Sequence, residues 1–169
     1  MFTLDLFEGI DEEVVRKTMK RIHQNLEKVA IQFCCNKHVR NHFACTDEFL
    51  QSRILIENKK FATSFYDDNA KELVKVFTEA MNHNWYLIKD FLRKEAVDLT
   101  ISYDFKKSLG FGYMANTQGV FEDLHMVQVH IKKDENSDHG FIIATAYPTI
   151  TKDIKPDKSV EWLRNKEAV

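Results

Sequence analysis

Residues 97–105 read VDLTISYDF, and in this segment the periodicity of the apolar residues changes from that of a helix to that of a strand. Every odd position from Val97 to Phe105 is apolar or aromatic, whereas every even position is polar. Because successive side chains of a strand point to opposite faces of a sheet, this alternation predicts a β-strand with one buried face.

More strands are predicted downstream of this segment. Apolar residues alternate over 127–131, and residues 140–148 read GFIIATAYP, which is typical of a central strand. The polar turn at 134–140 lies between them and indicates an antiparallel hairpin. The glycine-containing segment 110–119 indicates either a bent connection or a second strand with a bulge.

The sequence before residue 97 has the three- and four-residue spacing of amphipathic helices. Asp11 and Thr46 each precede such a segment and can cap its first turn, and a third segment can be capped from Asp67, Asp68 or Asn69. Helices are expected over 11–33, 47–55, 70–80 and 85–93, with a brief strand over 61–65. Helices followed by strands with short connections predict an α+β fold, in which N-terminal helices pack on a bent antiparallel β-sheet.

The length of 169 residues is that of a single compact domain. Within it we distinguish an N-terminal helix in residues 1–35, a central part over 36–150 and a tail over 151–169. Residues 160–165 of the tail could form a short helix. A hydrophobic content of 44% is sufficient for a real core and excludes a disordered chain.

The charge of the chain is nearly balanced, with 24 basic against 26 acidic residues. This balance gives no overall attraction to nucleic acid or to an anionic membrane. Residues 32–66 and 106–133, however, each contain an excess of basic residues. Any binding of a polyanion is therefore expected to be local, modest and sensitive to salt.

The cysteines and the N-terminal segment indicate a reduced, cytoplasmic chain. Cys34, Cys35 and Cys45 are odd in number and crowded together, which does not suit a framework of disulfides. The acidic segment MFTLDLFEGIDEE does not resemble a signal peptide, and no apolar run approaches the ~18 residues of a membrane helix.

The common nucleotide and cofactor motifs are absent from the sequence. We find no GxxxxGK[ST], no GxSxG, no HExxH and no CxxC pair, which excludes most enzymes that depend on a nucleotide or cofactor. No cofactor is therefore expected.

His38 and His42 are four residues apart, a spacing that can bind a metal if the segment is helical. A catalytic zinc would need a third ligand, from Cys34, Cys45 or a later histidine. A zinc enzyme is thus one hypothesis, and two partly exposed turn histidines are the other.

Four residues together have the composition of a metal-free phosphodiester site: His42, Arg53, Thr145 and Tyr147. Arg53 lies beside the apolar face of a predicted helix, where its charge calls for an anion. Thr145 and Tyr147 are two apart in a strand and so point to the same side. An imidazole can transfer protons, and the other groups can hold phosphate oxygens. Ordinary filling of the strand is the alternative for the threonine and the tyrosine.

Three segments carry a resemblance to a known family: HVRNHFACTDEFLQSR (38–53), ATSF (62–65) and GFIIATAYP (140–148). They resemble the bacterial RNase A-like toxin domain found at the C-terminal ends of contact-dependent growth inhibition toxins and other polymorphic toxins. The resemblance extends over residues 36–149.

The resemblance implies a role for each candidate residue. His42 would be the acid–base histidine, Arg53 the cation that binds phosphate, and Thr145 and Tyr147 further active-site residues. His38 matches the first histidine of the family's pair, and its role stays open, as does the identity of the second acid–base group.

The resemblance also implies a function. The chain would be a metal-independent endoribonuclease with an RNase A-like fold, cleaving RNA through attack of the 2′-hydroxyl to give a 2′,3′-cyclic phosphate. A cognate immunity protein, a monomeric state, no membrane association and delivery by secretion into the cytoplasm of a target cell would follow. The alternative is a non-catalytic RNA- or protein-binding domain of the same fold.

Overall fold

Two antiparallel sheets of three strands each form the frame of the computed structural model, which describes residues 11–162 and, of residues 37, 38 and 40, only the main chain. The strand orders are β1-β3-β4 and β2-β5-β6. The strands are β1 Phe61–Phe65, β2 Asp98–Asp104, β3 Gly110–Met114, β4 Thr117–Leu124, β5 Met126–Lys133 and β6 Phe141–Thr149. The expected α+β fold is confirmed, with its β-structure divided between two sheets.

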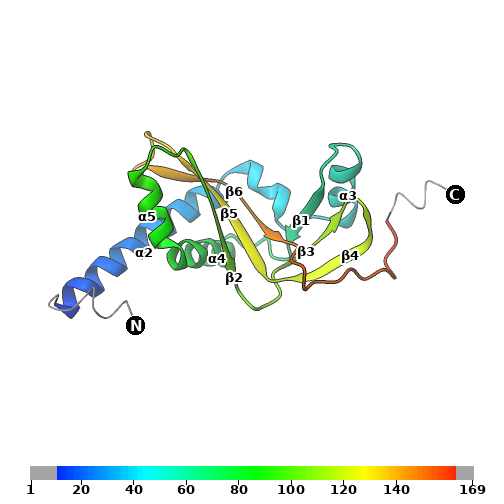
Figure 1. The fold of residues 1–169 in the computed structure, drawn as a ribbon, viewed down its shortest axis with the longest axis horizontal. Helices are drawn as coiled ribbons and strands as arrows, with labels where there is room; N and C mark the ends of the chain where they lie inside the picture. The colour runs from blue at the N-terminus through cyan, green and yellow to red at the C-terminus, as the bar shows by residue number, and fades with distance from the viewer. Residues whose placement is uncertain (1–10, 163–169) are drawn as a thin grey trace.

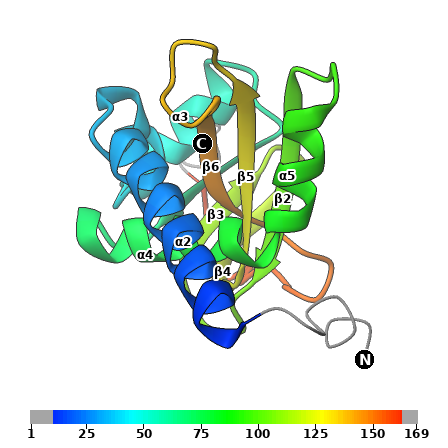
Figure 2. The same ribbon diagram turned by 90° about the vertical axis from the view of Figure 1, so that its left-hand side faces the viewer.

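The helices lie mainly at one end of the molecule. They are α2 Glu12–Cys34, the 3-10 helix η1 Lys37–His42, α3 Asp47–Leu55, α4 Ala70–His83 and α5 Trp85–Arg93. In Figure 1, α2, α4 and α5 lie beside the β2-β5-β6 sheet, whereas α3 lies at the other end with β1 and β3. Figure 2 shows β5 and β6 between α2 on one side and α5 on the other.

The predicted helix starts are confirmed by side-chain caps. Asp11, Thr46 and Asn69 each accept a hydrogen bond from a main-chain N–H two or three residues later. Such a bond satisfies one of the N–H groups that the first turn of a helix leaves without a partner. Local sequence therefore determines where these helices begin.

The two sheets approach each other at the start of β3, where Gly110 lies close to both β1 and β6. A side chain on Gly110 would lie 2.3 Å from the main-chain oxygen of Ser64 and 2.7 Å from the ring of Pro148. Only glycine permits this approach. The segment 110–119, expected as a bend or a bulged strand, forms the whole of β3 and the start of β4, with register shifts between them.

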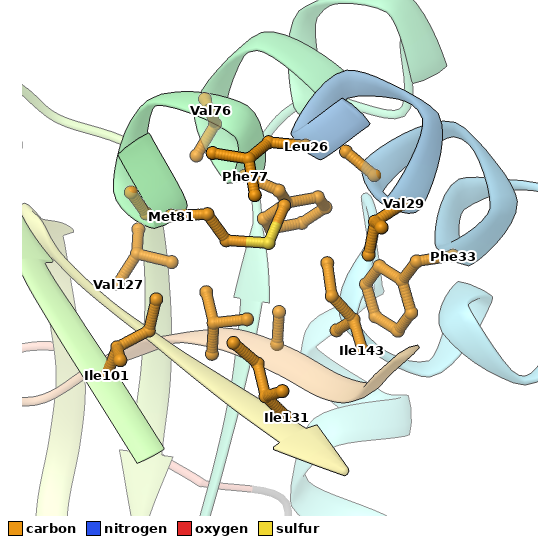
Figure 3. Close-up of a cluster of buried hydrophobic side chains, with 14 of the residues drawn as sticks. Leu26, Val29, Phe33, Val76, Phe77, Met81, Ile101, Val127, Ile131 and Ile143 are labelled. Carbon is orange, nitrogen blue, oxygen red and sulfur yellow. The ribbon is translucent and has the colours of Figure 1, made fainter. Parts of the chain in front are cut away.

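The main core lies between α2, α4 and the β2-β5-β6 sheet (Figure 3). Phe77 is fully buried at its centre. Its ring makes edge-to-face contacts with Phe33 and Phe65, at centroid distances of 5.3 and 5.6 Å, and is stacked on Phe43 at 6.1 Å. Phe43 directly follows His42, so the core fixes one side of the loop that carries this histidine.

A second, smaller core lies between α3 and the β1-β3-β4 sheet, and the tail closes it. Trp162 is 1% exposed and donates from Nε1 to the main-chain oxygen of Gly119 at 3.0 Å. The short helix predicted at 160–165 is wrong for residues 160–162, because the tail is irregular there and places Trp162 in this core. Residues 163–165 lie outside the described range.

The three cysteines are free thiols in the structure. Among residues 11–162, no helix combines the length and the apolar character that a membrane span requires.

Candidate active site

His42 ends η1 and contacts the main chain of β1. Its Nδ1 donates to the main-chain oxygen of Thr63 at 3.4 Å, and the hydroxyl of Ser64 donates to the main-chain oxygen of His42 at 3.3 Å. A hydrogen on Nδ1 leaves Nε2 as the unprotonated nitrogen of the neutral ring. The main chain of β1 therefore selects the tautomer in which Nε2 can accept a proton.

The surroundings of His42 keep the ring neutral. Burial lowers its pKa from 6.5 to about 4, and the positive charges of Arg53 and Lys59 act in the same direction. The hydrogen bond to Thr63 opposes this shift without cancelling it. At neutral pH the imidazole is thus a proton acceptor.

Tyr147 on β6 is the central aromatic residue of the site. Its ring centroid lies 5.6 Å from that of His42, 5.7 Å from that of Phe61 and 5.5 Å from that of His130. Burial raises the pKa of its hydroxyl, so the group keeps its hydrogen at neutral pH. The site thus contains a neutral imidazole next to a neutral phenol.

The hydroxyl of Tyr147 is bonded to two side chains of β5. It donates to Oε1 of Gln128 at 3.1 Å, and Nε2 of His130 lies 3.0 Å from it. Nδ1 of His130 in turn lies 2.8 Å from the hydroxyl of Thr100 on β2.

The sequence analysis missed His130 and Gln128. Both alternate with the apolar residues of the strand at 127–131, so they lie on its opposite face. In the β5–β6 hairpin they pair with Thr145 and Tyr147, respectively. The register of the predicted hairpin is the signal that places these residues beside the predicted site.

Thr145 and Tyr147 line the same surface hollow, as their spacing in the strand predicts. The hollow has a volume of about 390 Å³, and its walls include Thr100, His130 and Lys132. It therefore offers hydroxyl, imidazole and ammonium groups, together with the carboxylate of Asp98, on one face of the β2-β5-β6 sheet.

Arg53 lies on α3, and its side chain is only 15% exposed. Its Nε donates to Oε2 of Glu57 one turn later, at 3.3 Å. A guanidinium carries five N–H donors, and this bond uses one of them. The charge of Arg53 is close enough to the imidazole of His42 to contribute to its lowered pKa.

His38, the other residue predicted for the site, belongs to η1, but its side chain lies outside the described residues. Among the side chains that the structure describes, no three His, Cys, Asp or Glu residues are grouped as metal ligands. Of the predicted residues, His42 and Tyr147 are in ring contact, Arg53 acts on His42 through its charge, and Thr145 shares the hollow with Tyr147.

Comparison with known families gives this site its context. The family model described as "Bacterial CdiA-CT RNAse A domain" matches residues 37–148, which is more than half of the chain. The chain belongs to this family. It is therefore an RNase A-like toxin domain of contact-dependent growth inhibition, as the resemblance of its segments implied.

A solved structure supports the same assignment. The toxin domain is similar to a chain in the crystal structure of the CdiA-CT/CdiI complex from Y. kristensenii 33638, with a TM-score of 0.61 and 25% sequence identity. The match covers 68% of this chain and 100% of the other. A search of curated proteins gave no match. The whole of α2 and the tail after β6 lie outside the range of the family model.

Proposed function

We propose that this toxin domain is a metal-independent endoribonuclease that cleaves RNA by attack of the 2′-hydroxyl on the adjacent phosphodiester. The products would be a 2′,3′-cyclic phosphate and a free 5′-hydroxyl. The observation that carries the proposal is the neutral, buried imidazole of His42, which lies beside the Tyr147 phenol and within the electrostatic reach of Arg53. The nucleophile belongs to the substrate, so the protein supplies only proton transfer and stabilisation of charge.

Each residue has a role that its environment supports. Nε2 of His42 accepts the proton of the 2′-hydroxyl, because Nδ1 is bonded to Thr63. Arg53 and the Thr145 hydroxyl hold the non-bridging oxygens of the phosphate. Tyr147 donates a hydrogen bond to the reacting group, and the departing 5′-oxygen takes up a proton from solvent to become the 5′-hydroxyl. Charge on the phosphate increases during the attack, and donors fixed in advance stabilise that charge.

The partners follow from the family. The similar structure contains the CdiI protein, and we propose that this domain is likewise bound by a cognate immunity protein. The domain itself acts as a monomer on RNA, after delivery into the cytoplasm of a target cell. Basic residues in 32–66 and 106–133 give the local positive charge that RNA binding needs.

The decisive experiment is cleavage of end-labelled RNA by the purified domain in excess EDTA. We expect full activity in the chelator and fragments that end in a 2′,3′-cyclic phosphate, which acid treatment opens and which phosphatase alone does not remove. Loss of activity in EDTA that added metal restores would overturn the proposal, and so would fragments that end in a 3′-hydroxyl. Binding of RNA without any cleavage would instead identify a non-catalytic domain.

The acid limb of the pH profile should report the pKa of His42. We expect kcat/KM to remain level from pH 7 to about pH 5 and to fall tenfold per pH unit below about pH 4, because kcat/KM follows the free enzyme's base. A solvent-exposed imidazole would begin to lose activity near pH 6.5. Initial rates at low substrate concentration, with folding checked by circular dichroism at each pH, measure this limb.

The same profile offers a matched variant. The positive charge of Lys59 lowers the pKa of His42, so Lys59→Gln should move the acid limb to higher pH. A limb centred near pH 6.5 in the unaltered domain would show that His42 is not the base.

A further inference from the structure

We infer that His130, on β5, is a positioning residue for Tyr147. It donates a hydrogen bond to the hydroxyl oxygen of Tyr147, so that the hydroxyl hydrogen can be donated to the substrate. This inference rests on the proposed function and assigns the direction of one hydrogen bond within it. A series of hydrogen bonds connects Thr100, His130, Tyr147 and Gln128.

The directions of these bonds follow from the number of hydrogens available. Tyr147 has one hydroxyl hydrogen, and it is directed at Oε1 of Gln128, 3.1 Å away. The contact of 3.0 Å between the same hydroxyl and Nε2 of His130 therefore requires the hydrogen to be on Nε2. His130 donates and Tyr147 accepts, whichever charge state the ring has.

Thr100 supports this orientation of the His130 ring. In the neutral imidazole with hydrogen on Nε2, Nδ1 is an acceptor. The Thr100 hydroxyl, 2.8 Å away, then donates to it. The hydrogen bonds all run in one direction, from Thr100 through His130 and Tyr147 to Gln128, and bonds aligned in this way strengthen one another.

The arrangement determines what Tyr147 can do when RNA binds. Its oxygen is already bonded to His130, and its hydrogen points to Gln128, a neutral acceptor on the same face of the hairpin. A phosphate oxygen or the departing 5′-oxygen carries more negative charge than an amide oxygen and is the stronger acceptor. The hydrogen can rotate from Gln128 to the substrate while His130 keeps the phenol oxygen in place.

The hollow beside these residues is the place for that substrate oxygen. Thr145 and Tyr147 line it together with His130, and Thr145 is the register partner of His130. His42 lies against the Tyr147 ring. The base and the directed phenol therefore act on the same reacting group, and His130 acts on it through Tyr147.

A double-mutant cycle tests this inference. His130→Ala should lower kcat by about 10- to 100-fold and leave KM within about twofold, because a misplaced donor affects the reaction more than the binding. In a Tyr147→Phe background the same substitution should cause no further loss, since the hydroxyl through which it acts is gone. His130→Gln should recover most of kcat, because an amide N–H can replace the donor at Nε2.

The controls separate the possible outcomes. His139→Ala removes an imidazole from the turn that joins β5 and β6 and should behave as the unaltered domain, with melting temperatures recorded for every variant. The inference would be overturned if His130→Ala kept the kcat of the unaltered domain, or if its loss multiplied with that of Tyr147→Phe. It would also be overturned if His130→Gln folded but did not recover kcat. Absence of cyclic-phosphate product from the unaltered domain in EDTA would instead overturn the proposed function.

Discussion

His42→Ala is expected to lower kcat/KM for RNA cleavage by about 10²- to 10⁴-fold, the range that a positioned acid–base group contributes. The variant loses the only base of the proposed mechanism and keeps the phosphate-binding residues Arg53 and Thr145. Binding of RNA should therefore change little while turnover falls. Cleavage of a labelled oligonucleotide and its binding at equilibrium measure the two effects separately.

His23 provides the matched control for this substitution. It lies on α2, its side chain is 53% exposed, and it is outside the range of the family model. His23→Ala should cleave RNA as the unaltered domain does. Equal cleavage by His42→Ala and His23→Ala would show that His42 is not the base, and a large fall in melting temperature alone would indicate a structural role.

Phe77→Ala is expected to have the largest effect on stability. The ring is fully buried and contacts the rings of Phe33, Phe43 and Phe65. Truncating a phenylalanine in such a core removes its burial and leaves a cavity, which costs about 3–5 kcal/mol of the free energy of unfolding. Urea denaturation followed by circular dichroism measures this difference.

An exposed aromatic residue serves as the comparison. Tyr86 on α5 is 68% exposed, and Tyr86→Ala should change the free energy of unfolding by no more than about 0.5 kcal/mol. If the two variants unfold at the same urea concentration, the packing of α4 against the sheet described above is wrong. A loss of RNA cleavage in Phe77→Ala at temperatures where it remains folded would show that Phe43 transmits the core packing to His42.

Those parts of the fold that local interactions determine could be predicted from the sequence. Asp11, Thr46 and Asn69 cap helices because their side chains reach main-chain N–H groups a few residues away. The alternation at 97–105 likewise predicts β2, because the burial of each side chain follows from the pleat of the strand.

Features that depend on distant contacts were not predicted. The division into two sheets requires β3 to approach Ser64 and Pro148 closely at Gly110, and these residues are far apart in the sequence. The irregular tail has the same origin, since Trp162 packs into a core formed by other segments. Periodicity along one segment holds no information about such approaches.

The candidate site shows the same contrast. Thr145 and Tyr147 were placed on one side of their strand from their spacing, and they line one hollow. His130 and Gln128 were missed because the polar face of an alternating strand usually faces solvent. Only the pairing of β5 with β6 shows that this face lies against the tyrosine.

The hydrogen bond from His42 to the main-chain oxygen of Thr63 has an evolutionary consequence. Where a carboxylate side chain orients a catalytic imidazole, a single substitution can remove the acceptor. Here every residue type at position 63 supplies the same carbonyl oxygen. Close packing restricts the size of the side chain at this position, which is 1% exposed, but mutation there cannot delete the acceptor. The tautomer of the proposed base is thus robust to sequence drift in the strand that supports it.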